Sequence, residues 1–142
     1  MTKCDVTLTA EVELRVPFED GDPMGVTWHG NYFRYFERAR CELLDKIDFG
    51  YRAMVGSGYH WPIVDTRVKF LRPTVFEQRI RVLATLEEYE NRLKIGYVIS
   101  DVESGERLTK GFTIQIAIDS ATNELCFVSP PVLIEKVRTC TQ

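Results

Sequence analysis

The chain has 142 residues, of which 44% are hydrophobic and 27% charged, and its formal net charge is -3. This length and composition are typical of one globular domain, and the negative charge argues against nucleic acid or an anionic membrane as a partner. No stretch reaches the roughly 20 apolar residues of a membrane-spanning helix. The first residues lack an apolar segment like that of a signal peptide, which favours a cytoplasmic protein.

The first predicted element is a half-buried strand over residues 6–16, where apolar and polar side chains alternate. A loop rich in glycine, proline and aspartate follows over 17–30. A helix then begins at Tyr32, with Asn31 as its expected N-cap, and runs for roughly 17 residues to near Gly50. At about 100° per residue, one stripe of this helix is apolar: Tyr32, Tyr35, Phe36, Ala39, Leu43 and Ile47.

Further alternating segments predict strands after the helix: 63–70, 79–88, 92–99 and 109–118. Turn residues separate the last three segments, as in hairpins. A short strand is expected around 125–128, and Ser129-Pro-Pro131 is expected to end the sheet. This order predicts an α+β fold in which an antiparallel sheet curls around one long helix.

The segment from Asp20 to Arg40 carries the chemically informative residues. Two carboxylates, Asp20 and Asp22, stand in a turn that runs through glycines into the predicted helix. This order places an acid close to the unpaired N–H groups of a helix N-terminus. An acid beside such donors suits acyl transfer or hydrolysis, although Asp22 equally fits an Asx turn before proline.

A family resemblance begins at the same residues. The stretch from Asp22 to Tyr32, followed by Glu37-Arg-Ala-Arg40, resembles the hotdog-fold thioesterases, and above all 4-hydroxybenzoyl-CoA thioesterase and its acyl-CoA thioesterase relatives. The stretch Lys69-Phe-Leu-Arg-Pro73 resembles the strand-and-proline segment that follows their helix. The resemblance covers about residues 6–135.

This resemblance implies a single hotdog domain over residues 1–142, with five to six antiparallel strands around a central helix. It also implies a homodimer or homotetramer with active sites at the subunit interface. Residues 61–72 are the candidate interfacial strand, because an edge strand that is not protected by charge invites pairing.

The resemblance further implies an acyl-thioester hydrolase that acts on acyl-CoA or on an acyl carrier protein. Asp22 would serve as nucleophile or as general base on water, and a main-chain N–H near His29 and Gly30 would polarise the thioester carbonyl. Only the main chain of His29 matches the family by position; its side chain would either orient water or substrate or pack in the loop. No metal or redox cofactor is expected. Substrate-binding candidates come from three segments: Trp28, Gly30, Asn31, Tyr59, Trp61, Arg67 and Lys69.

Plainer roles remain open for several of these residues. Asn31 fits a helix cap better than a ligand contact, Trp28 fits the core, and Arg67 and Lys69 fit a solvated strand face. The four cysteines have no CxxC spacing and are expected to be reduced, with the last one in a C-terminal tail: Cys4, Cys41, Cys126 and Cys140.

Alternative assignments concern the catalytic acid and the class of protein. Glu37 is the fallback acid, because some hotdog thioesterases place their acid on the helix. Arg40 is expected to form a structural ion pair, Asp20 to be a solvated turn residue, and Ser57 lacks the glycine pattern of a nucleophile elbow. A non-catalytic acyl-thioester binding protein, or a dehydratase-like hotdog protein that uses His29, is the alternative function.

Overall fold

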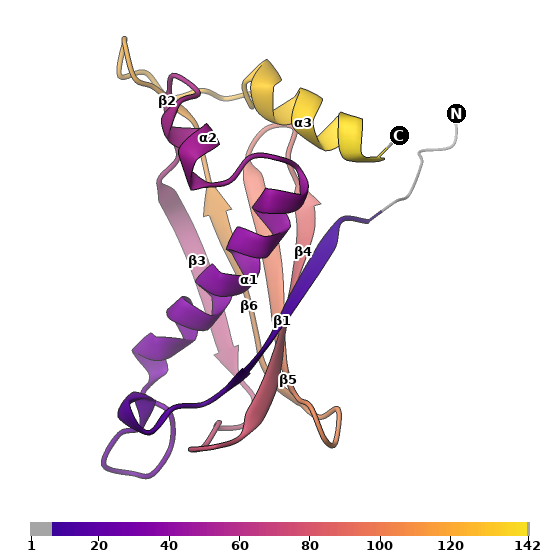
Figure 1. The fold of residues 1–142 in the computed structure, drawn as a ribbon. Helices are drawn as coiled ribbons and strands as arrows, with labels where there is room; N and C mark the ends of the chain where they lie inside the picture. The colour runs from indigo at the N-terminus through magenta and orange to yellow at the C-terminus, as the bar shows by residue number, and fades with distance from the viewer. Residues whose placement is uncertain (1–6, 142) are drawn as a thin grey trace.

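The computed structural model describes residues 7–141, and a five-stranded antiparallel sheet forms its frame (Figure 1). The strand order is β1-β4-β5-β6-β3, which confirms the expected α+β arrangement. The strands are β1 (Thr9–Arg15), β3 (Ile63–Phe70), β4 (Arg79–Glu88), β5 (Leu93–Asp101) and β6 (Arg107–Gln115). The predicted beginning of the first strand at Val6, the absence of a signal segment, and Cys4 lie outside the described residues.

The long helix α1 (Tyr32–Lys46) lies across one face of the sheet, which curls around it (Figure 1). The whole predicted apolar stripe of this helix is buried. At its centre Phe36 stacks on Tyr97 of β5, with ring centroids 4.4 Å apart. The helix ends about one turn before the expected Gly50, because the chain turns at Asp48, whose φ of 54° lies in the left-handed region.

The strand predictions over 63–70 and 79–88 coincide with β3 and β4. The prediction over 109–118 is displaced, since β6 begins at Arg107 and ends at Gln115. The chain then leaves the main sheet, and β7 (Ile118–Asp119) pairs instead with β2 (Tyr59–His60) in a small second sheet. The strand expected around 125–128 is wrong, because Leu125 forms only a single bridge with Ile118.

Two helices were not predicted, α2 (Tyr51–Val55) and α3 (Pro131–Thr141). Pro131 occupies the first position of α3, where proline loses no hydrogen bond. The helix buries Leu133 and Val137, and Cys140, expected in a tail, lies on it with Sγ 3.2 Å from the Lys46 carbonyl oxygen. None of the helices in the described part of the chain is both long and apolar enough to cross a membrane.

The two ends of the sheet carry different segments (Figure 1). The loop before α1 and the β3–β4 connection meet at the lower end, whereas α2, β2 and α3 lie at the upper end. Strand β3 stands at the edge of the sheet and runs from the upper end to the lower end. It is exposed at every position except Val68, so its free edge is available for pairing.

Candidate active site

Asp22 organises the loop before α1. Its Oδ1 accepts hydrogen bonds from the N–H groups of Met24 at 2.8 Å and Val26 at 3.4 Å. Its own N–H donates to the Val26 carbonyl oxygen at 2.8 Å, and Gly25 supplies the positive φ of 82° that the turn requires. The Asx turn is therefore formed, and it uses Oδ1 alone: within residues 7–141 no hydrogen bond is donated to Oδ2.

The half-buried Asp22 borders a pocket of about 280 Å³ at the lower end of the sheet. The wall combines a carboxylate, an imidazole and a guanidinium with aromatic and aliphatic side chains, which suits a ligand that has an apolar body and a polar reacting group. Three segments line the pocket: Asp22, Val26, Thr27 and His29 from the loop, Tyr32 from α1, and Phe70, Leu71, Arg72 and Pro73 from the β3–β4 connection.

Hydrogen-bond donors lie at the start of the helix, beside the same pocket. His29–Asn31 forms a short 3-10 turn that leads directly into α1, closed by a bond from the Asn31 N–H to the Trp28 carbonyl oxygen at 2.9 Å. Across residues 7–141, the N–H groups of His29 and Gly30 donate to no protein acceptor. They lie at the positive end of a helix, which favours a developing negative charge.

Trp28 covers this turn. Its ring lies against that of His29, with centroids 5.2 Å apart, and is 51% exposed, so it belongs to the surface and not to the core. A Cβ built at Gly30 would overlap the Trp28 ring. Glycine at position 30 therefore lets the indole lie flat over the turn that carries the two donors.

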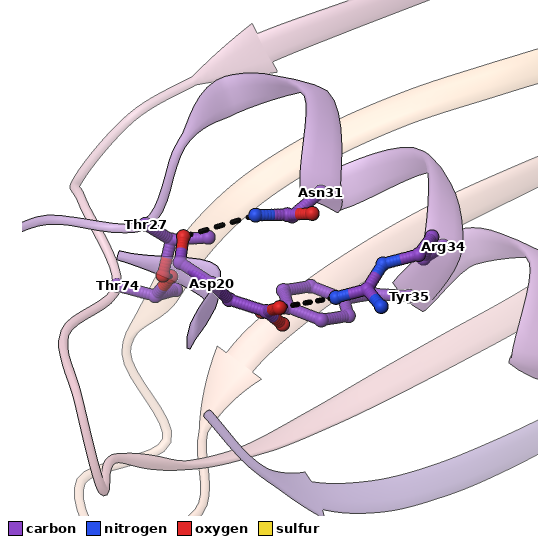
Figure 2. Close-up of polar contacts among 6 residues, drawn as sticks. All are labelled: Asp20, Thr27, Asn31, Arg34, Tyr35 and Thr74. Carbon is purple, nitrogen blue, oxygen red and sulfur yellow. Dashed lines mark hydrogen bonds and ion pairs between the residues drawn. The ribbon is translucent and has the colours of Figure 1, made fainter. Parts of the chain in front are cut away.

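The structure corrects the expectation for Asp20 and half of the expectation for Asn31. Asp20 is a buried residue, not a solvated one, and its carboxylate accepts a hydrogen bond from the Tyr35 hydroxyl at 2.6 Å and pairs with Arg34 (Figure 2). Asn31 stands at the N-cap position of α1, as expected, but its backbone is helical and its side chain makes no capping hydrogen bond. Its Nδ2 instead donates to the Asp20 carbonyl oxygen at 2.9 Å.

Sequence reasoning also missed the residues that fasten the loop to the β3–β4 connection. The N–H of Thr27 donates to the Thr74 carbonyl oxygen at 2.8 Å, and the two threonine hydroxyls are hydrogen-bonded. The Tyr32 hydroxyl lies 3.2 Å from the Thr74 hydroxyl. One signal was present in the sequence: tyrosine hydroxyls on a buried stripe require partners, and Tyr32 and Tyr35 both stand on that stripe.

Strand β2, which contains Tyr59, lies at the upper end of the sheet (Figure 1), and Trp61 lies between β2 and β3, so neither residue joins Asp22 within one protomer. The eight-residue strand β3 begins just after them and ends at Phe70 in the pocket wall, and its length is roughly 25 Å at the rise of a strand. Trp61 packs on Phe49 with ring centroids 5.3 Å apart. Close to them, the Ser57 hydroxyl donates to the Met54 carbonyl oxygen at 2.6 Å and serves a turn.

Arg67 and Lys69 are both exposed and, being two residues apart, share the outer face of β3. The register places Lys69 directly opposite Lys110 of β6, a pairing of like charges that costs stability. In the described part of the chain, none of the three cations forms an ion pair. Lys110 was not singled out from the sequence, because its neighbour is distant along the chain.

Arg40 forms an ion pair with Glu37 and is 13% exposed, which confirms its expected structural pairing. Glu37 borders a second hollow of about 330 Å³ between β1 and α1, together with Asp20. It does not line the pocket that contains Asp22. Among residues 7–141, no group of three or more His, Cys, Asp or Glu residues is arranged to hold a metal ion.

Comparisons with known proteins agree with this architecture. The sequence profile of the thioesterase-like superfamily matches residues 16–137. A putative esterase of Synechocystis is 30% identical over 126 residues, which cover 88% of this chain and 76% of that protein. A putative acyl-CoA thioesterase of Bacillus subtilis is 28% identical over 108 residues, covering 75% of this chain and 78% of the relative.

Among solved structures, a DHNA-CoA thioesterase from Staphylococcus aureus is similar with a TM-score of 0.75 and 30% identity. The similarity covers 84% of this chain and 80% of that one. The expected hotdog fold is thereby confirmed, with the sheet wrapped around α1 as its defining feature. The chain belongs to the thioesterase-like superfamily.

Proposed function

We propose that this protein hydrolyses acyl-CoA thioesters in the pocket beside Asp22. One observation carries the proposal: Asp22 and His29 line the same pocket. Within residues 7–141, Oδ2 of Asp22 accepts no hydrogen bond, and the N–H groups of His29 and of the adjacent Gly30 donate to no protein acceptor. Family membership, and relatives named as acyl-CoA thioesterases, support the same reaction.

The chemistry assigns separate roles to the two features. Oδ2 of Asp22 takes a proton from a water molecule as that water attacks the thioester carbonyl, or attacks the carbonyl itself to give an anhydride that water then cleaves. In either route the carbonyl oxygen gains negative charge, and the N–H groups of His29 and Gly30 stabilise it. The tetrahedral intermediate collapses by breaking the carbon–sulfur bond, and the thiolate leaves and gains a proton.

The pocket is completed by a second copy of the chain in this proposal. Two antiparallel β3 edges, related by a two-fold axis, bring the Ile63 end of one strand to the Phe70 end of the other. The partner's Tyr59 and Trp61 would then lie beside the pocket of the first protomer. Pairing would also satisfy the unpaired backbone groups of the exposed β3 edge.

The basic residues of β3 and β6 would hold the nucleotide end of the substrate. Arg67 and Lys69 on β3 and Lys110 on the neighbouring β6 form a strip close to the end of β3 at Phe70, which lines the pocket. Phosphate groups are strong acceptors for such cations. A binding role explains why like charges are kept opposite each other in a protein with net negative charge.

A mixing experiment tests the shared site. Asp22→Asn and Tyr59→Ala are each expected to be nearly inactive as pure proteins. In a mixed dimer one of the two sites recombines both intact residues, so an equimolar mixture should recover about a quarter of the wild-type activity. Activity would be measured as thiol release from a panel of acyl-CoAs. Absence of recovery in confirmed mixed dimers would contradict the shared pocket, and formation of an enoyl product would indicate a dehydratase instead.

A further inference from the structure

We propose that Asp20 is a positioning residue for the donor turn, a role that rests on the proposed function. Its buried carboxylate is held by α1, and its main-chain carbonyl holds both ends of the segment 28–31 (Figure 2). The N–H groups of His29 and Gly30 lie between those two attachments. Asp20 would therefore fix the direction of the donors without touching the substrate.

The carboxylate of Asp20 is anchored from two sides. The Asp20 side chain is 3% exposed, so its charge requires partners inside the protein. The Tyr35 hydroxyl donates to Oδ2 at 2.6 Å, and the Arg34 guanidinium pairs with Oδ1. Burial and the adjacent charge of Asp20 raise the pKa of Tyr35, so this hydroxyl remains a donor over the working pH range.

The carbonyl oxygen of Asp20 accepts two further bonds. The Trp28 N–H donates to it at 2.8 Å, and Asn31 Nδ2 donates at 2.9 Å. Trp28 and Asn31 flank His29 and Gly30 in the chain, so one oxygen atom ties the turn before and after its two donors. The side chain of Asn31 makes this bond to Asp20 instead of the expected capping bond to the start of α1.

Asp20 does not line the pocket beside Asp22 but borders the hollow between β1 and α1 instead. A direct part in the reaction is therefore not available to it. Any effect of Asp20 on the reaction passes through the main chain. The geometry of a donor matters greatly, since a misplacement of about 1 Å can cost about 100-fold in rate.

The test compares Asp20→Asn and Tyr35→Phe with a variant matched in stability. Asparagine has an acceptor oxygen at only one of the two positions that Tyr35 and Arg34 occupy, and the phenylalanine removes one anchor while leaving the ring packed. We expect kcat to fall by about 10- to 100-fold with KM nearly unchanged. Ile99→Val, a buried change in β5, is chosen to lower the melting temperature similarly and should keep wild-type kcat.

A second readout does not require activity. The amide signals of His29 and Gly30 in nitrogen-15 NMR should shift and exchange faster in Asp20→Asn and Tyr35→Phe, but not in Ile99→Val. Arg34→Gln, at a side chain that is 61% exposed, provides a milder anchor loss if Asp20→Asn does not fold. Unchanged amide signals together with unchanged kcat would overturn the positioning role.

The two proposals fail differently in this design. If the wild-type protein hydrolyses no acyl-CoA, the proposed function fails, while the amide signals still decide whether Asp20 orders the turn. If the wild type is active and Asp22→Asn is not, but the Asp20 and Tyr35 variants retain full kcat, only the positioning role fails. A rise in KM alone would also refute it, because substrate affinity would then be the affected quantity.

Discussion

Replacing Asp22 by Asn and by Ala separates its chemical role from its structural role. Asparagine keeps an Oδ1 that accepts from Met24 and Val26, so the Asx turn remains, while the base or nucleophile is lost. Alanine loses both. Of the two turn bonds, the one at 2.8 Å is of ordinary length and the one at 3.4 Å is long, so their loss should cost about 1 kcal/mol in total. This corresponds to about 4 °C in melting temperature for a chain of this size.

The assay measures thiol release at saturating acyl-CoA, together with thermal unfolding. Asp22→Asn should lower kcat by at least about 100-fold at an unchanged melting temperature. Asp22→Ala should show the same loss of kcat and an added drop in melting temperature. If Asp22→Asn keeps near wild-type kcat, the carboxylate serves only the turn, and Glu37 becomes the next acid to test.

Three further predictions follow from single contacts. Gly30→Ala should lower kcat about tenfold or more, because the added Cβ displaces the Trp28 ring. In a double-mutant cycle, the same change should lower kcat less when Trp28 is already replaced by alanine. Lys69→Ala and Lys110→Ala should each raise KM for acyl-CoA severalfold at constant kcat, and their KM should depend less on salt than that of the wild type. Lys136→Ala, which removes a surface ion pair with Asp48, should leave KM unchanged. Diluting the wild type should lower its mass by light scattering and its specific activity in parallel; a fully active monomer would contradict the shared pocket.

The elements of the main sheet and α1 could be predicted because each has a strong local period. Alternation defined β3 and β4 to the residue, and the apolar stripe of α1 was recovered in full. The segments that were missed lack such periods. Helix α3 begins at the second of two prolines that also fit the end of a sheet, and β7 is only two residues long and depends on a partner in β2.

The candidate site could be predicted from the sequence where a residue bonds to neighbours in its own segment. Asp22 stands in a turn whose residues are contiguous, so the motif was sufficient to single it out. The roles of Asp20 and Thr74 depend on groups that fold back from α1 and from the β3–β4 connection. Spacing along the chain contains little information about contacts between distant segments. A small change in the path of the loop decides whether a carboxylate faces solvent or the helix.

The two loop carboxylates illustrate how neighbouring acids take different roles. Asp20 has both oxygens occupied by Tyr35 and Arg34, and the arginine offsets its charge. Asp22 has one oxygen in its turn and the other directed to no donor within the described residues. The Asp20 carboxylate is thus held on both oxygens and does not line the Asp22 pocket, whereas, within residues 7–141, Oδ2 of Asp22 is left without a protein donor beside that pocket. This difference in hydrogen bonding, rather than position in the sequence, is the reason why we propose the proton-accepting role for Asp22 and the positioning role for Asp20.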